Sequence, residues 1–179
     1  MKRTIKINKF MDELCLTQAY ECENDSFQVD SSDLNRPGLQ LSGFYEYFST
    51  DRVQLIGLGE MTYLLGLDEK VAGERLSAYL DHDLPCIVIS RGLEPPAMLV
   101  ELCKRAQTPL FLSDKSSTKL MHQISIYLDT ELAPTIARHG GLIDVYGVGI
   151  FLTGESGVGK SETALELVKR GHRMVADDV

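Results

Sequence analysis

The sequence is short of long apolar runs. No window of its 179 residues approaches the roughly 18 apolar residues that a membrane-spanning helix needs. Residues 1–7 are basic, but they lack the apolar stretch of about 7 to 15 residues that a signal peptide carries. These absences predict a soluble, cytoplasmic protein that does not contact a membrane.

Cysteine is scarce and irregularly spaced. The chain has 4 cysteines, with no C-x-x-C pair and no histidine at a spacing typical of zinc sites: Cys15, Cys22, Cys86 and Cys103. This pattern supports neither a disulfide framework nor a metal site. We therefore expect reduced thiols that are partly buried.

Basic residues are outnumbered by acidic ones. The chain has 18 Lys and Arg against 26 Asp and Glu, a net charge of −8, and the acidic excess is spread along the sequence. Nucleic-acid binding depends largely on neutralising phosphates with a basic surface. The balance therefore predicts that nucleic acid is not a partner.

The chain does contain a phosphate-binding motif. One segment satisfies every fixed position of the pattern G-x-x-x-x-G-K-[ST], in which backbone N–H groups point inward and glycine lets the backbone approach a phosphate. Its lysine would reach the β- and γ-phosphates, and its serine hydroxyl would complete the shell of a Mg²⁺ ion. We predict that this loop binds the phosphates of a nucleotide through Gly154, Glu155, Ser156, Gly157, Val158, Gly159, Lys160 and Ser161.

The flanks of this motif match the structural context that it requires. Residues 148–153 are apolar and predict a buried strand, and residues 161–170 predict a helix with Gly171 at its C-terminal cap. A strand, a glycine-rich loop and a helix in that order are typical of a genuine phosphate loop.

The first 130 residues predict a small α/β domain. Strands are expected at 38–41, 52–56, 85–90 and 109–113, and helices at 60–81, with a break near Gly66, at 95–105 and at 115–132. Strands that alternate with helices in this way imply parallel pairing with right-handed crossovers. The aromatic group at residues 44–48 is assigned to core packing.

A domain boundary is expected between residues 129 and 134, where Pro134 blocks the preceding helix. This gives domains at 1–130 and 131–179. The second begins with a hairpin of residues 142–147 and the strand before the loop, and it closes with a strand at 173–176.

We expect the chain to stop inside this domain, which leaves an unpaired edge and an unburied apolar face. Residues 1–130 are expected to fold alone, and residues 131–179 to be disordered or mispaired in isolation.

Three further positions are candidates for phosphate chemistry. Asp177 and Asp178 follow the strand at 173–176, and because adjacent residues face opposite ways, only one is expected to point at the γ-phosphate. His139, before Gly140, is a candidate proton shuttle or hydrogen-bond donor. The alternatives are a solvated acidic turn and a structural histidine before a glycine turn.

Several of these segments together resemble the HPr kinase/phosphorylase family. The matching residues are His139-Gly140, 144–147, the phosphate loop with its trailing Glu162, and 170–178, with weaker matches at 36–44, 90–93 and 132–134. The resemblance covers nearly the whole chain, as the N-terminal domain and the start of the catalytic phosphate-loop domain. Family members continue well beyond the last residue, Val179.

The resemblance implies a bifunctional enzyme of carbon regulation. Such an enzyme uses ATP and Mg²⁺ to phosphorylate a serine of the phosphocarrier protein HPr, and it reverses the transfer with inorganic phosphate, giving pyrophosphate. It also implies a homohexamer. By position, Lys160 would neutralise the transferring phosphoryl group, Ser161 would bind Mg²⁺, His139 would assist at the phosphates, and Asp178 would exchange the serine proton.

Two other functions remain open from the sequence. The chain alone could be a non-catalytic module that only associates with copies or partners, because little of the second domain is present. A kinase that shares the loop but acts on a small molecule is the other alternative, and the Ala-Asp-Asp strand end so near the loop weighs against it.

Overall fold

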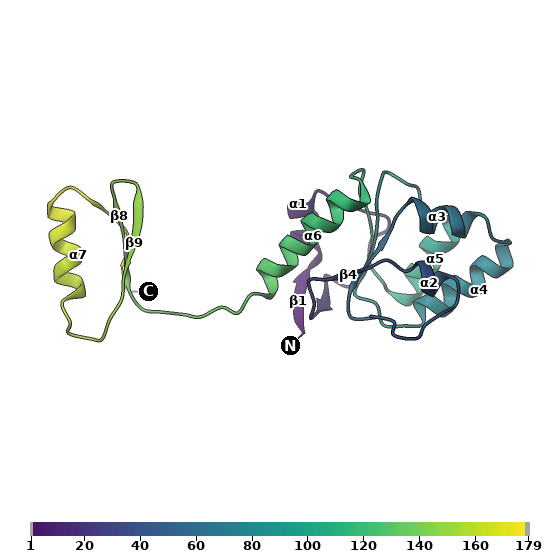
Figure 1. Cartoon of the computed structure of the whole chain (residues 1–179), viewed down its shortest axis with the longest axis horizontal. Coiled ribbons are helices and arrows are strands. Elements are labelled where there is room, and N and C mark those ends of the chain that lie inside the picture. The colour runs from purple at the N-terminus through teal and green to yellow at the C-terminus, as the bar shows by residue number, and fades with distance from the viewer. Residues whose placement is uncertain (1, 178–179) are drawn as a thin grey trace. The chain divides into compact units, whose positions relative to one another are not determined.

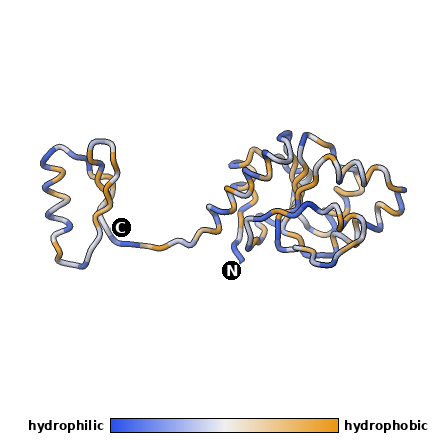
Figure 2. Tube along the Cα trace, in the orientation of Figure 1, coloured by the Kyte–Doolittle hydropathy of each residue, from blue (hydrophilic) through white to orange (hydrophobic). Residues whose placement is uncertain are grey.

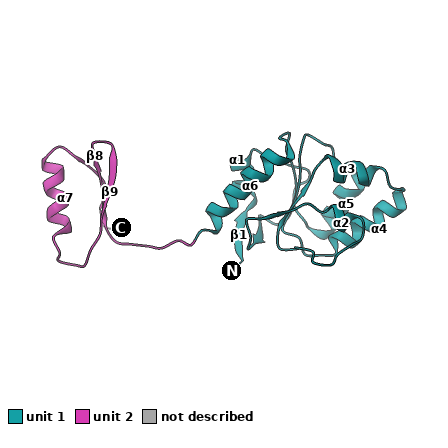
Figure 3. Ribbon diagram, viewed as in Figure 1, with its two compact units in different colours: residues 1–133 teal, residues 134–179 magenta. Residues whose placement is uncertain are grey.

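The computed structural model describes residues 2–177, and the chain separates into two compact units, residues 1–133 and 134–179 (Figure 3). The first unit is a mixed α/β layer structure (Figure 1). The second is a smaller unit of one helix and three strands within the described residues.

A five-stranded sheet forms the centre of the first unit. Its strands lie in the order β2-β7-β6-β5-β4, and all neighbours are parallel except the β2–β7 pair, which is antiparallel. The parallel pairing that the sequence predicted is therefore confirmed. The strands are β2 (Thr17–Gln18), β4 (Leu34–Asn35), β5 (Val53–Ile56), β6 (Ile87–Ile89) and β7 (Leu110–Leu112).

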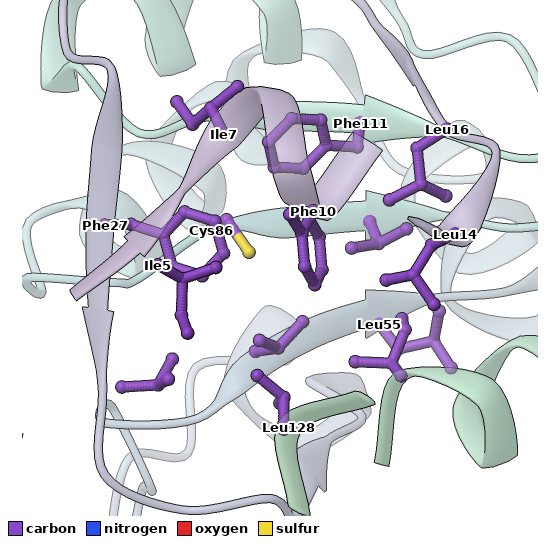
Figure 4. Close-up of a cluster of buried hydrophobic side chains, with 14 of the residues drawn as sticks. Ile5, Ile7, Phe10, Leu14, Leu16, Phe27, Leu55, Cys86, Phe111 and Leu128 are labelled. Atoms are coloured by element: carbon purple, nitrogen blue, oxygen red, sulfur yellow. The ribbon is translucent and has the colours of Figure 1, made fainter. Parts of the chain in front are cut away.

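One face of this sheet is covered by two helices and a two-stranded ribbon. The helices are α1 (Ile7–Leu14) and α6 (Ser117–Leu132), and the ribbon pairs β1 (Arg3–Lys6) with β3 (Ser26–Val29) in antiparallel register. Phe10 of α1 stands at the middle of this core, with ring centroids 5.1 Å from Phe27 and 5.4 Å from Phe111 (Figure 4). Aromatic packing thus joins helix, ribbon and sheet.

The opposite face of the sheet is covered by four helices. Leu41, Met61, Leu76 and Leu99, one from each helix, are buried against Ile56, Ile87 and Ile89 of the strands. Because both faces are covered, the central strands are apolar almost throughout, as Figure 2 shows. The helices are α2 (Gly38–Leu41), α3 (Leu58–Leu65), α4 (Glu69–Leu80) and α5 (Ala97–Ala106).

One polar side chain lies inside the sheet, and all its hydrogen-bonding groups are used. The Oε1 atom of Gln54 accepts hydrogen bonds from Asn35 Nδ2 at 2.8 Å and from the Tyr79 hydroxyl at 3.1 Å. Its Nε2 atom donates to the carbonyl oxygens of Ser49 and Arg52. Burial of this amide is tolerated because no donor or acceptor is left unpaired.

The predicted elements from residue 52 to residue 132 are confirmed, with ends that shift by a few residues. The helical stretch 60–81 does divide, and Gly66 caps the end of α3 before α4 begins at Glu69. Pro96 directly precedes α5, where a residue without a donor is tolerated. The four cysteines are free, and Cys86 and Cys103 are buried.

The strand predicted at 38–41 is wrong, because these residues form the short helix α2. The Leu41 N–H donates to the Pro37 carbonyl oxygen at 2.9 Å, which is a helical i to i−4 bond. Four residues of alternating hydropathy are too few to separate a period of two from one of 3.6. Here Leu39 is exposed and Gln40 is buried, so the alternation does not mark an inner face.

The aromatic group at residues 44–48 is divided between core and surface. Tyr45 and Phe48 pack against the core on the four-helix face, and the Phe48 ring lies 5.8 Å from that of Tyr79. Phe44 and Tyr47 are exposed. The assignment to packing therefore holds for two of the four rings.

The second unit is built on a hairpin, as the sequence predicted. β8 (Gly141–Val145) pairs antiparallel with β9 (Val148–Leu152) through a tight turn in which Tyr146 and Gly147 have φ of +53° and +84°. β10 (Arg173–Ala176) pairs antiparallel with the other side of β8. α7 (Lys160–Lys169) connects β9 to β10, and Gly171 follows it with φ +94°.

The core of the second unit is small. Ile143 and Ala164 are its buried apolar residues among those described, whereas Val148, Phe151 and Val175 are substantially exposed. Within the described residues β9 has a strand partner on one side only. The predicted free edge and unburied apolar face are thus both present.

Over the described part of the chain, no helix is both long enough and apolar enough to cross a membrane.

Glu60 gives the first unit a pH-dependent contribution to stability. Its carboxylate accepts from the Gly57 N–H at 3.0 Å and pairs with Arg36 Nη2 at 2.7 Å, and its side chain is 10% exposed. Burial alone would raise the pKa of Glu60, but these hydrogen bonds outweigh burial and leave the pKa lowered. A lowered pKa stabilises the fold above the carboxyl's ordinary range and ceases to do so as pH falls through it.

We expect Glu60→Gln to lower the free energy of unfolding by about 1–2 kcal/mol at neutral pH, because a charge-assisted pair is lost. The difference from the unsubstituted chain should shrink as the pH falls below the ordinary carboxyl pKa. Urea denaturation at several pH values measures it, with Glu101→Gln on the exposed side of α5 as the control. A difference that does not change with pH would contradict this account.

Candidate phosphate-binding site

The loop between β9 and α7 has the backbone that a phosphate cradle needs. Gly154, Gly157 and Gly159 have φ of +155°, +83° and +95°, a region that favours glycine. Gly159 is also the N-terminal cap of α7. The positive end of the helix therefore lies at the end of the loop, where an anion is favoured.

Lys160 folds back over this loop. Its Nζ atom donates to the carbonyl oxygens of Gly154 and Glu155, each at 2.9 Å. The ammonium group thus lies above the loop's own backbone, beside a pocket of about 300 Å³ lined by Thr153, Val158 and Thr163 among others. Phosphate oxygens are stronger acceptors for an ammonium group than neutral carbonyls.

The first turn of α7 presents small polar groups. Ser161 is exposed, and the Thr163 hydroxyl donates to the Gly159 carbonyl oxygen at 2.9 Å. The Glu162 carboxylate lies close to Gly159, 3.8 Å from where a Cβ there would be. Its first-turn position suits the helix dipole.

The strand order brings three predicted segments together at the edge of the sheet where β9 and β10 end and β8 begins. They are the segment before β8, the start of the loop and the residues after β10. β9 and β10 both run antiparallel to β8, so they run in the same direction on either side of it. Gly141, at the start of β8, pairs with Leu152, and the next residue pairs with Ala176. The start of the loop, the residues after β10 and the segment before β8 therefore meet at this edge.

The backbone is tightly packed at this edge. A Cβ on Gly140 would overlap the Leu152 carbonyl oxygen and the Phe151 ring. A Cβ on Gly141 would lie 3.8 Å from the Ala176 carbonyl oxygen and 4.0 Å from Asp177 Oδ1. Glycine at position 140 therefore lets the segment of His139 approach the end of β9 that leads into the loop, whereas the contacts at position 141 are of ordinary length.

The predicted site residues are thus placed as follows. Residues 154–159 of the loop form the turn between β9 and α7, Lys160 and Ser161 begin α7, and His139 is an exposed residue at the same sheet edge. Asp177 follows β10 there, whereas Asp178 lies outside the described residues. His172 lies elsewhere, because its ring packs at 4.8 Å on Tyr146 at the hairpin turn.

The sequence reasoning did not assign the close packing at Gly140 and Gly141. Two adjacent glycines directly before an apolar strand are a signal for close backbone approach. The close contact at Gly140 is with Phe151 and Leu152 of β9, the hairpin strand that the sequence predicted.

The fold is α/β and the loop between β9 and α7 has the backbone of a phosphate cradle. Comparison with known proteins specifies the family. The profile described as the HPr serine kinase N terminus matches residues 5–128, and that of the HPr serine kinase C-terminal domain matches residues 130–179. The chain therefore belongs to the HPr serine kinase family. The resemblance seen in the sequence is confirmed.

Curated relatives agree with this assignment. A protein named HPr kinase/phosphorylase from Alkaliphilus metalliredigens is 47% identical over 176 residues, which cover 98% of this chain and 57% of the relative. Another of that name, from Caldanaerobacter subterraneus subsp. tengcongensis, is 44% identical over 174 residues, or 97% of this chain and 57% of the relative. The chain thus spans little more than half the length of these relatives.

A solved structure matches more weakly. The regulatory region of Clostridium perfringens pyrophosphatase, with its CBS and DRTGG domains, matches 67% of this chain and 46% of its own. The TM-score is 0.48 at 13% identity, so no functional argument rests on this likeness.

Gly140→Ala tests the close packing at the sheet edge. The added methyl group would meet the Leu152 backbone, so we expect the hairpin to lose more than about 1 kcal/mol of stability. Amide hydrogen exchange of β8 and β9 measures this loss. Gly149→Ala is the matched control, because its Cβ would meet only Leu142 Cδ1 at an ordinary 3.8 Å. Equal exchange rates in the two variants would refute the packing argument.

Proposed function

We propose that the protein to which this chain belongs is a bifunctional, ATP-dependent protein-serine kinase and phosphorylase that acts on the phosphocarrier protein HPr, in the regulation of carbon metabolism. The observation that carries the proposal is the loop itself, with three glycines at positive φ and Lys160 lying over it at the start of α7. Membership of the HPr serine kinase family supports HPr as the acceptor.

Each proposed residue has a defined task. The backbone of Gly154–Ser161 would hold the ATP phosphates, and Lys160 would leave its two carbonyl partners to bind the transferring phosphoryl group. His139 would donate a hydrogen bond to a phosphate oxygen from the sheet edge. These groups neutralise charge and orient the donor, which is most of what phosphoryl transfer requires of a protein.

Proton transfer is assigned to Asp178. In the forward direction its carboxylate would take the proton of the HPr serine hydroxyl. The serine oxygen would bond to the γ-phosphorus of ATP, and the bond between this phosphorus and the oxygen of the β-phosphate would break. In the reverse direction inorganic phosphate attacks the phosphoserine, pyrophosphate forms, and Asp178 returns a proton to the serine oxygen. The base of one direction is the acid of the other.

The metal is proposed to be Mg²⁺, held by the Ser161 hydroxyl together with phosphate oxygens and water. In residues 2–177 no group of three acidic, histidine or cysteine side chains is arranged to hold a metal. That finding fits an ion bound mainly by the nucleotide, because Mg²⁺ commonly uses few protein ligands and keeps several waters. Bound there, Mg²⁺ would neutralise the phosphate charge.

We further propose a cytoplasmic homohexamer, as the family resemblance implies, with separate domains at residues 1–130 and 131–179. Residues 1–133 have a core covered on both faces, which also suits the alternative that this stretch acts as a non-catalytic association module. The transfer experiment below tests the acceptor.

Lys160→Met tests the phosphate site in this chain. We expect Mg²⁺-ATP binding, measured by isothermal titration calorimetry, to weaken by about ten- to a hundredfold, because a hydrogen bond to a charged phosphate is lost. Lys169→Met, at the last turn of the same helix, is the matched control and should bind as the unsubstituted chain does. Similar losses in both variants would show that the effect is not specific to the loop.

Phosphate transfer tests the activity. We would join residues 1–179 to the C-terminal remainder of the Alkaliphilus metalliredigens relative and incubate the product with HPr, Mg²⁺ and ATP. Intact-mass spectrometry should show one phosphate on HPr, and Asp178→Asn should slow the transfer by about a hundredfold or more, because a general base is lost.

The chain of residues 1–179 alone serves as the comparison in this experiment. Transfer by the longer protein without transfer by the shorter one would assign residues 1–179 to binding and association. Failure of the longer protein to phosphorylate HPr, with ATP binding intact, would overturn HPr as the acceptor and point to a small-molecule substrate.

A further inference from the structure

A groove in the first unit, far in sequence from the phosphate loop, has no part in the proposed transfer. It lies between α1 and α6 and has a volume of about 380 Å³. Leu14 and Ile126 give it apolar walls, and the Ile126 side chain is half exposed. At one side Lys9 Nζ and Glu131 Oε1 form an ion pair of 2.6 Å that joins the two helices.

Two residues of the groove lining each have a polar atom with no hydrogen-bond partner among the described residues. The atoms are Gln123 Oε1 and the Tyr127 hydroxyl, and both are shielded from solvent. The residues are four apart on α6 and therefore share one side of the helix. Native structures rarely leave such atoms unpaired without a ligand, an ion or a water to satisfy them.

Two carboxylates, those of Glu13 and Glu131, lie near these atoms. The carboxylate of Glu13 lines the same groove, and no ion pair or hydrogen bond joins it to any residue between 2 and 177. Burial raises the pKa of Tyr127 to about 12, and the nearby Glu131 and Glu13 carboxylates contribute to this rise. Lys9 is the cation of the groove, and it is already paired with Glu131.

We propose that this groove binds a small organic cation with a guanidinium or ammonium head and an apolar stem. Such a head offers several donors and no acceptor, which matches the unpaired oxygens of Gln123 and Tyr127 and the carboxylate of Glu13. The stem would lie against Leu14 and Ile126. The terminal amide of Gln123 turns about a soft torsion, so exchanging the places of its oxygen and nitrogen would present the oxygen to a bound head group. Because Lys9 is paired with Glu131, the carboxylate of Glu13 leaves the lining with a net negative charge, which disfavours an anion.

The probe is n-butylguanidinium, added to the ¹⁵N-labelled chain of residues 1–179 and followed by amide chemical shifts. We expect saturable shifts confined to α1 and α6. Gln123→Leu should weaken binding by about tenfold, because an acceptor for a charged donor is lost. Gln123→Glu should strengthen it. Glu13→Gln should weaken it by about two- to fivefold, the usual effect of an exposed charge pair.

Three comparisons decide the result. Glu101→Gln on α5 should bind as the unsubstituted chain does, n-butylammonium should bind, and n-butanol should not. Absence of saturation by n-butylguanidinium would overturn the proposal and assign the unpaired atoms to bound water. Equal affinities for Gln123→Leu and Gln123→Glu, or equal binding of n-butanol, would overturn it as well. Far-ultraviolet circular dichroism confirms that each variant is folded.

Discussion

The covering of sheet faces by helices is the constraint on which both units depend. In residues 1–133, helices lie on both faces of a mostly parallel sheet, so β5, β6 and β7 are buried from both sides. In residues 134–177, α7 is the single described helix for three strands, and apolar side chains such as Val148 and Phe151 stay exposed. The first unit therefore has a closed core of its own, whereas the second presents surface that a further layer would bury.

The candidate site lies in the less covered unit, and its geometry comes from strand direction. A single strand, β8, separates β9 from β10 and makes their carboxyl ends point to the same edge. Glycine at position 140 then allows the backbone to pack against the Leu152 carbonyl oxygen, which brings the segment of His139 to the start of the loop. The pairing of β10 with β8 brings the residues after β10 to the same place. A side chain at position 140 would separate the His139 segment from the end of β9 without changing any residue of the loop.

Elements that depend on interactions between residues close in the sequence were predicted, and those that depend on distant residues were not. The loop, its strand and helix, and the alternating elements from residue 52 to residue 132 depend on local periodicity, capping and proline, and all were predicted. The prediction that the strand before the loop is buried was wrong, because β9 is largely exposed in a unit with a single described helix. The strand predicted at 38–41 failed because four residues cannot establish a period. Elements before residue 36 were not assigned, although α1 has apolar residues at helical spacing, because it has only 8 residues. The pairing of β10 with the other side of β8 depends on nonlocal contacts that no local pattern records, whereas Gly140 packs against β9, the hairpin strand that was predicted.

Two glutamines show how polar groups are used differently within one unit. Gln54 is fully buried in the sheet, and its amide is hydrogen-bonded at both ends, so it fixes neighbouring strands and turns in one arrangement. Gln123 lines the groove between α1 and α6 with its oxygen unpaired, four residues from the unpaired hydroxyl of Tyr127. An apolar side chain at position 123 or 127 would remove no hydrogen bond among the described residues. An apolar side chain at position 54 would remove four. Polar groups that the fold itself does not use are the ones available to a ligand.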